Sequence, residues 1–437
     1  MNRLLIKNCV PAIIALTLTG LYSVIDGLFI GNAQGDNGLA AINIAWPVTA
    51  LITAAGTGIG TGGSILYASF CGKKKQKAAD SVLLQTQLLF LITGIALLLV
   101  LGICKDGLLS LFGAKGIIFT LAEQYTKVIL LGSLFQVVGA GVIPLLRSIG
   151  MAVSAMVVTI IGMIINMTAN AIFLFVFHMG IRGTACGTVL AQSVVCVAGL
   201  FLIAKKTRVW IRCATVWQQS VYRIGRILSM GVASFGVAMS ATIVLIFTNR
   251  QCLWYGGTKA VAVYAVISYL VFPVQSLLQG VGEGALPLMS FAYGKGDQKE
   301  LRCIKRGAKF LLAGLSILVF VAAAFSIPVI GTWFGMSKTG CQLFVHGMKI
   351  SALAFCMMGF VKFHIAEQSA IQNVKEAFLL TYGESLLLAP GLLFLLPIKL
   401  GLDGIWWSLP GTAAGMLLFY YLLQKGNQAK EMRNDCE

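Results

Sequence analysis

Charged residues are scarce in this sequence. Of its 437 residues only 11% are Asp, Glu, Lys or Arg, whereas 58% are hydrophobic. Soluble globular proteins usually carry about 25% charged residues. A chain with so few charges cannot cover a large water-exposed surface, and the composition therefore argues against a soluble protein.

Residues that enzymes use for catalysis are also few. The three histidines, His178, His346 and His364, stand outside any metalloprotease, catalytic-triad or deaminase pattern. The eleven cysteines are scattered singly, and no two have the spacing of a zinc or redox site. No phosphate-binding loop of the Gly-Lys-Ser/Thr type occurs. We therefore expect no enzyme activity, no direct ATP hydrolysis and no cofactor.

Long apolar segments are abundant instead. A helix needs about 20 apolar residues to cross a bilayer, whereas a membrane β-barrel needs short alternating strands. The continuous runs in this chain predict an all-α membrane protein with twelve transmembrane helices. They lie near residues 8–31, 39–70, 84–104, 124–146, 153–177, 183–204, 227–252, 260–293, 309–333, 345–371, 377–397 and 404–424.

The formal net charge of +18 could suggest a nucleic-acid partner, but the basic residues are not spread as such a surface requires. They gather after the second, sixth and eighth apolar segments and at the C-terminus. Positive charge marks the cytoplasmic side of membrane proteins. The distribution predicts a multi-pass protein of the plasma (inner) membrane with both termini in the cytoplasm, and no nucleic-acid partner. No cleavage site follows the first apolar segment, so we expect that segment to remain as a span.

A duplicated glycine pattern divides the chain into two halves. Gly60, Gly62 and Gly72 recur 222 positions later as Gly282, Gly284 and Gly294. Gly58-x-Gly60-x-x-Gly63 formally matches a dinucleotide fingerprint, but it lies in an apolar span, where small residues serve close helix packing. The repeat predicts two pseudo-symmetric six-helix lobes, 1–204 and 227–437, joined by a cytoplasmic linker, 205–226. An even number of spans per lobe makes the repeats parallel.

Several polar residues interrupt the apolar spans of the first half. Asp26 is a carboxylate inside the first span, and such residues are paired, neutralised or functional. Asn166 and Asn170 are four apart and share a helix face. With the Thr188 hydroxyl, their oxygens would suit a small cation. The alternative is hydrogen bonding between helices without any ion. Pro11, earlier on the first span, would permit a bend.

The second half also has ionisable residues within its spans, namely Glu283, Lys362, Glu367 and Glu384. One interpretation is that Lys362 neutralises a glutamate. The other is an acidic wall that attracts a cationic substrate. His364 and Glu367 are three apart, so a proton relay between them is a further hypothesis.

Together these motifs resemble the multidrug and toxic compound extrusion (MATE) family over nearly all of residues 5–424. The similarity rests on a proline, an acidic residue and an aromatic-Ile-Gly turn in the first span, and on a glycine-rich second span. It also rests on paired asparagines in the fifth span and a Gly-x-x-Gly start to the sixth. Here these are Pro11, Asp26, Phe29-Ile30-Gly31, Gly58–Gly72, Asn166, Asn170 and Gly183–Thr188. Two positions depart from the family pattern: Glu283 stands where Gln is more usual, and Gln372 where Gly is common.

The resemblance implies a twelve-helix fold whose two lobes form a V-shaped cavity. It also implies a monomer that exports small organic, often cationic, compounds in exchange for Na⁺ or H⁺. The family's cation site carries over to Asp26, Asn166, Asn170 and Thr188, which would be the metal ligands if the ion is Na⁺. Aromatic and Met side chains suit a polyspecific substrate wall. Tyr22, Met163 and Phe173, together with Glu283 and Glu367, are the candidates for that wall.

Two other functions remain open from the sequence. A lipid-linked saccharide flippase of the same superfamily would commonly have more spans and a strongly basic cavity, whereas the basic residues here lie almost entirely in the loops. A non-transporting membrane sensor or channel is less compatible with the internal repeat and the polar residues of the spans. Counterflow of Na⁺ or H⁺ with substrate would separate the antiporter from both.

Overall fold

The computed structural model describes the backbone of residues 2–207, 220–333 and 338–434. Side chains are described at these positions except 2, 23–36, 39, 220–222, 258, 328–333, 338 and 427–434. Within this part of the chain the structure is almost entirely helical and contains no strand, so the all-α class is confirmed.

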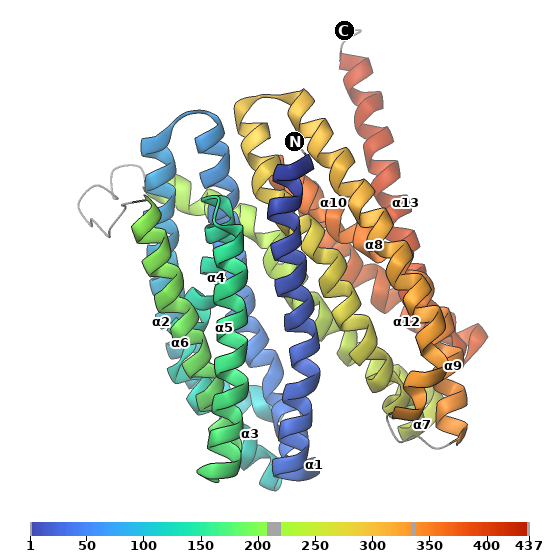
Figure 1. The fold of residues 1–437 in the computed structure, drawn as a ribbon. Helices are drawn as coiled ribbons and strands as arrows, with labels where there is room; N and C mark the ends of the chain where they lie inside the picture. The colour runs from blue at the N-terminus through green and yellow to red at the C-terminus, as the bar shows by residue number, and fades with distance from the viewer. Residues whose placement is uncertain (1, 208–219, 334–337, 435–437) are drawn as a thin grey trace.

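The helices of the first half form one bundle and those of the second half another, side by side (Figure 1). The first bundle contains α1 (Asn2–Gly72), α2 (Gln76–Leu111), α3 (Gly116–Leu131), α4 (Ser133–Ser148), α5 (Ala152–Ala171), the π-helical turn η1 (Ile172–Val176) and α6 (Ile181–Thr207). The second contains α7 (Ser220–Lys295), α8 (Gln298–Trp333), α9 (Lys338–Ser351), η4 (Ala352–Cys356), α10 (Met358–Ala370), α11 (Val374–Tyr382), η5 (Gly383–Leu388), α12 (Ala389–Leu400) and α13 (Leu402–Asn434).

The described helices account for most of the predicted spans. Ten helical stretches are long and apolar enough to cross a bilayer, and an eleventh results if the bent pair α3–α4 is one span. Helix α1 holds the first two spans, and α7 holds the seventh and eighth, which meet at Gly257 with φ 64° and ψ −165°. The twelfth predicted segment, 404–424, lies in α13, which is helical but is not one of these ten stretches.

The fourth predicted span is not one continuous helix. Between α3 and α4 the axis bends by 62°. A bend leaves backbone groups without helical partners. Here the side chain of Gln136 donates to the carbonyl oxygen of Ile129 at 2.8 Å, and the Ser133 hydroxyl donates to the carbonyl of Gly94 at 3.0 Å. The Gln136 bond gives a carbonyl at the end of α3 a partner, and the Ser133 bond attaches the start of α4 to α2.

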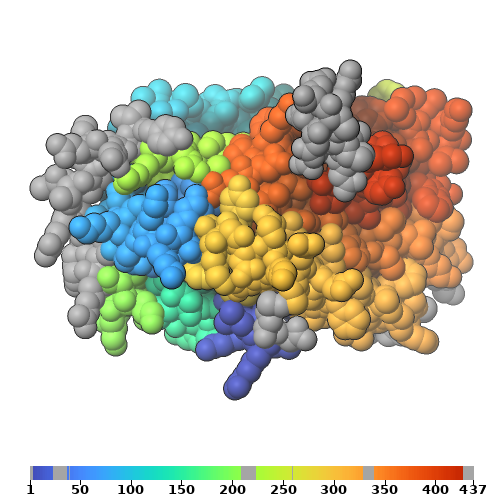
Figure 2. Space-filling view, turned by 90° about the horizontal axis from the view of Figure 1, so that it is seen from above, coloured from blue at the N-terminus to red at the C-terminus, as the bar shows by residue number. Residues whose placement is uncertain are grey.

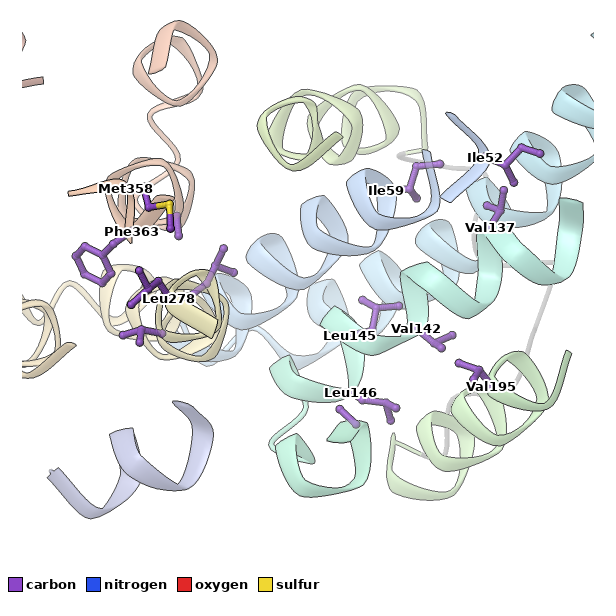
Figure 3. Packing of buried hydrophobic residues seen from close by; sticks show 14 of the residues in the cluster. Ile52, Ile59, Val137, Val142, Leu145, Leu146, Val195, Leu278, Met358 and Phe363 are labelled. Atoms are coloured by element: carbon purple, nitrogen blue, oxygen red, sulfur yellow. The ribbon is translucent and has the colours of Figure 1, made fainter. Parts of the chain in front are cut away.

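Most of the buried apolar side chains form one cluster that extends through both halves (Figure 3). In the first half Ile52, Val137 and Val142 lie among α1 and α4, whereas Leu278 and Phe363 pack between α7 and α10 in the second. All five are buried. Because lipid is as apolar as these side chains, close packing rather than water exclusion must hold such helices together.

Two of the three repeated glycine pairs, Gly62 with Gly284 and Gly72 with Gly294, lie where the two halves touch. A Cβ atom placed on Gly62 would be 2.0 Å from the carbonyl oxygen of Ile227, and one on Gly72 would be 2.2 Å from that of Phe291. On the other half, a Cβ on Gly294 would be 2.1 Å from the carbonyl oxygen of Ser69. Only hydrogen fits in these places, so the glycines bring the backbones of α1 and α7 into direct contact.

The contact has the symmetry of the sequence repeat. Gly58 lies against Gly231 and Phe235, and its counterpart Gly280 lies against Ile13. Phe235 and Ile13 are themselves 222 positions apart, the same offset as Gly280 and Gly58. Each glycine-rich span therefore packs on the first span of the other half, as expected for two lobes related by an approximate two-fold axis.

Both termini and the α1–α2 and α7–α8 connections lie at one end of the molecule (Figure 1). Polar bonds between the halves reinforce the glycine contact at this end. Arg223 donates to the Ser81 hydroxyl at 2.9 Å, and the Gln372 amide donates to the Ser69 hydroxyl at 2.9 Å. Figure 2, which looks onto this end, shows residues of the two halves in contact across it.

Gln372 also explains one departure from the family pattern. Its φ of 63° is in the left-handed region, which costs an ordinary residue about 1–2 kcal/mol and favours glycine. Its side-chain oxygen accepts from Arg226 at 2.6 Å, while its amide group reaches Ser69. The two hydrogen bonds offset the strain, and they require a side chain that glycine lacks.

Candidate functional site

A group of polar side chains lies between α1, α5 and α6 in the first half. Asn166 and Asn170 are buried on one face of α5, as their spacing predicts. The Asn170 amide donates to the side-chain oxygen of Asn166 at 2.9 Å, and the Asn166 amide donates to the Thr188 hydroxyl at 3.3 Å. The Tyr22 hydroxyl of α1 also donates to the Asn166 oxygen.

A glycine leaves room for this group. A Cβ atom on Gly187 would lie 2.1 Å from the side-chain oxygen of Asn170. The π-helical turn η1 follows α5 directly after Asn170, and such turns often occur at functional sites. The local sequence therefore provides both the two amides and the space into which they project.

The structure thus brings together Asn166, Asn170, Thr188 and Tyr22. Asp26 lies in α1 one helical turn after Tyr22, but its side chain is outside the described residues. Within the described part of the chain, no three His, Cys, Asp or Glu side chains are grouped to hold a metal ion. The oxygens that the described side chains offer to a cation here belong to amides and hydroxyls, and oxygen ligands are those that hard cations take.

A central cavity of about 200 Å³ lies between the two halves. Its wall combines apolar and polar side chains of α1, α7 and α10. They are Leu16, Thr19, Thr57, Ser234, Val237, Ala238, Ala241, Phe272, Gln275, Ser276, Gln279, Glu283, Leu286, Lys362, Ile365, Ala366 and Ser369. Both halves contribute, so movement of one half against the other would change its shape.

The charged residues of this cavity are paired. Glu283 accepts from the guanidinium of Arg147 at 3.2 Å, and Lys362 contacts Glu384 at 2.8 Å. The Lys362 contact agrees with the interpretation that this lysine neutralises a glutamate. Glu283 and Lys362 are the two charged residues among the described lining, so the wall is not predominantly acidic.

Several predicted substrate-wall residues lie outside this lining. Met163 is 3.9 Å from the hydroxyl of Thr19, which does line the cavity. Phe173 packs near Gly183 and pairs with the Phe177 ring at 6.2 Å. Tyr22 belongs to the asparagine cluster. Of the five candidates, Glu283 alone is in the described cavity wall.

Glu367 is part of a buried ion cluster within the second half. Its carboxylate contacts Lys305 at 2.9 Å and the His364 ring nitrogen at 2.9 Å. The His364 ring stacks on Tyr420 with centroids 3.8 Å apart. These contacts join α8, α10 and α13 and give Glu367 a structural role, because its charge is already balanced by its neighbours.

Pro11 lies in the buried face of α1, and the helix continues through it without interruption. Its role as a hinge stays a prediction.

Arg147 is an important residue that the sequence did not point to. It stands directly after the apolar run of the fourth span, and its relation to Glu283, 136 positions later, has no local signal.

Comparisons with known proteins agree with this architecture. A family model named MatE matches residues 11–172 and 230–377. The multidrug export protein MepA of Staphylococcus aureus (strain NCTC 8325 / PS 47) is 22% identical over 426 residues, covering 95% of this chain and 92% of MepA.

Solved structures also match at low sequence identity. One described as the outward-facing conformation of a multidrug resistance MATE family transporter has a TM-score of 0.89 at 22% identity, covering 99% of this chain and 97% of that chain. Another, described as MATE in the straight conformation, has a TM-score of 0.90 at 22% identity, covering 98% and 97%. The twelve-helix, two-lobe fold is thereby confirmed.

Proposed function

This chain belongs to the MatE family, the multidrug and toxic compound extrusion transporters, and on that basis we propose that it exports organic compounds in exchange for Na⁺ or H⁺. The observation that carries the proposal is the partly buried Tyr22–Asn166–Asn170–Thr188 cluster. It lies in one lobe, apart from the central cavity that both lobes form. An ion and a substrate could therefore bind at separate places and still influence each other through lobe movement.

Coupling requires that the two ligands favour different conformations. Asp26 follows Tyr22 by one turn of α1, and the Tyr22 hydroxyl is bonded to Asn166. A cation that draws in the oxygens of Asp26, Asn166 and Asn170 would change how α1 meets α5. Since α1 also lines the central cavity, such a change would reach the substrate, with Pro11 allowing α1 to bend.

The proposed orientation places both termini in the cytoplasm of a cell whose plasma membrane the protein spans. The basic clusters after α1 and at the end of α7 lie at the same end as the termini, which the positive-inside rule assigns to the cytoplasm. The inter-lobe contacts close this end. In this conformation the substrate would leave toward the outside.

The central cavity supports an antiporter over a saccharide flippase. A flippase for a pyrophosphate-linked lipid needs several cations in its cavity. Among the described lining residues there is one basic side chain, Lys362, and it is paired with Glu384. The wall instead mixes hydroxyls, amides and Phe272, which suits organic compounds of moderate polarity. We propose that the protein acts as a monomer, as the family resemblance implies.

The proposal is tested in liposomes containing the purified protein. A Na⁺ gradient or a pH gradient is imposed separately, and movement of a fluorescent organic cation is followed for the native chain and for Asp26→Asn. We expect one gradient to drive transport and the variant to lose it, because the Asp26 carboxylate is the group proposed to take the ion's charge. Unimpaired transport by Asp26→Asn would exclude this ion site, and transport by neither gradient would favour the flippase.

A second prediction separates ion binding from helix packing. Thr188 and Thr159 each donate a hydroxyl hydrogen bond to the carbonyl four residues earlier, at 3.1 and 2.9 Å. Only Thr188 also accepts from Asn166. We expect Thr188→Val to weaken the apparent affinity for the coupling ion about two- to tenfold, which corresponds to the usual net free energy of one hydrogen bond. Thr159→Val is the matched control, and an equal loss in both variants would contradict an ion-binding role.

A further inference from the structure

A second cavity opens at the end of the molecule that carries both termini, the end seen in Figure 2. It has a volume of about 390 Å³ and is separate from the central cavity. Its wall comes from the start of α1, the connection between α4 and α5, and the second part of α7. The lining residues used below are Leu4, Lys7, Arg147, Val153, Ser154 and Phe291.

The cavity is positively charged. Arg147 and Lys7 line it, and no Asp or Glu is among its described lining residues. Arg147 is only 6% exposed and donates one hydrogen bond, to Glu283. A guanidinium has five N–H donors, and in the described part of the chain the others have no protein partner. Lys7 makes no ion pair with a described residue, so its charge is available to an anion. The charge of Arg147 is paired with Glu283, but its remaining N–H donors are available to an anion.

Backbone donors add to the positive potential. Helix α5 begins at Ala152, and no side chain accepts from its first N–H groups. Its first residues, Ala152 to Ser154, line the same cavity as Arg147 and Lys7. The free N–H groups of a helix start favour a phosphate. The buried guanidinium provides an independent reason for an anion at this place.

The edge of the cavity is apolar and exposed. Leu4 is 51% exposed, Val153 48% and Phe291 39%. These side chains stand on helices apolar enough to span a membrane, so their exposed surfaces suit contact with lipid chains. A free phosphate ion would make no favourable contact with such an edge. A lipid would place its headgroup inside the cavity and its acyl chains along the apolar edge.

From this combination we propose that the cavity binds the headgroup of an anionic phospholipid from the leaflet on the side of the termini. Basic pockets between helices on the cytoplasmic side recognise such headgroups. The phosphate lies between Lys7, the unused donors of Arg147 and the start of α5. Because the wall includes α1, α4 and α7, the bound lipid joins both lobes and stabilises the closed end.

The test measures lipid binding directly and does not depend on transport. Purified protein in neutral detergent is titrated with phosphatidylglycerol and with phosphatidylcholine of the same acyl chains, and bound lipid is counted by native mass spectrometry. We expect one phosphatidylglycerol molecule to bind with an affinity at least about fivefold higher than that of phosphatidylcholine, since each basic residue near a lipid surface contributes to the attraction of an anionic headgroup. Equal binding of the two lipids would overturn the proposal.

Charge-reversal variants locate the site. Lys7→Glu and Ser154→Glu should each lower phosphatidylglycerol affinity at least fivefold, because each places a carboxylate in the cavity. Lys299→Glu is the control, as Lys299 is an exposed lysine on α8 outside the cavity. Equal loss in all three would indicate general surface charge and refute the site. If inorganic phosphate displaced phosphatidylglycerol and bound with the same affinity, the cavity would be a site for free anions, and the lipid proposal would be refuted.

Discussion

Gly62→Ala is expected to force the two lobes apart at the end that carries the termini. Its Cβ would lie 2.0 Å from the backbone oxygen of Ile227 in the other lobe, and backbone cannot rotate away as a side chain can. Overpacking of this kind costs about 1–3 kcal/mol. Because the cost falls on the conformation that contains the contact, that conformation should lose roughly 5- to 100-fold in population, and transport should fall accordingly.

Cys9 is a native reporter of this change. It is fully buried, and its sulfur lies 3.6 Å from the carbonyl oxygen of Val281 on α7. Separation of the lobes would expose it, so its alkylation rate, measured by peptide mass spectrometry, should rise in Gly62→Ala. Gly294→Ala should act alike, because its Cβ would meet Ser69 of the first lobe.

Gly60 supplies the matched control for the glycine prediction. A Cβ on Gly60 would lie 2.2 Å from the backbone oxygen of Gly141, a clash of the same severity but within the first lobe. Gly60→Ala should lower thermal stability without exposing Cys9. If Gly62→Ala and Gly60→Ala raised the alkylation rate of Cys9 equally, the prediction that Gly62 specifically holds the two lobes together would be wrong.

The second large effect is expected from Arg147 and Glu283. Arg147 is buried on α4 of the first lobe, and Glu283 lies on α7 of the second, 3.2 Å away. Removing one partner of a buried pair leaves the other charge unpaired and costs about 3–5 kcal/mol. We expect Arg147→Met and Glu283→Gln each to reduce thermal stability strongly, and the double variant to lose less than the sum of the two.

A double-mutant cycle in detergent measures this coupling directly, because residues in one ion pair show non-additive effects. The exposed pair His346–Asp403, 2.9 Å apart at the other end of the protein, is the control and should show a coupling below about 1 kcal/mol. Additive losses for Arg147 and Glu283 would mean that their contact does not join the lobes. The same cycle would explain why Glu stands at a position where the family more usually has Gln.

The sequence was sufficient for features that depend on local patterns. Apolar length predicted most of the membrane-spanning helices, and the 222-residue repeat of Gly58, Gly62 and Gly72 predicted two related halves. The spacing of Asn166 and Asn170 placed both on one face of a helix. The bend between α3 and α4 was not predicted, because the bonds that Gln136 and Ser133 make there depend on where neighbouring backbone groups lie.

Hydropathy and helical period are properties of neighbouring residues, and for that reason the sequence by itself determined the class, the spans and the repeat of this protein. Only the tertiary structure decided that Arg147 meets Glu283, that Gln372 bonds to Ser69, and that Gly62 faces the other lobe while Gly60 faces its own. These contacts join residues far apart in the chain. They depend on the rotation of each helix and the angle between the lobes, which no local pattern records.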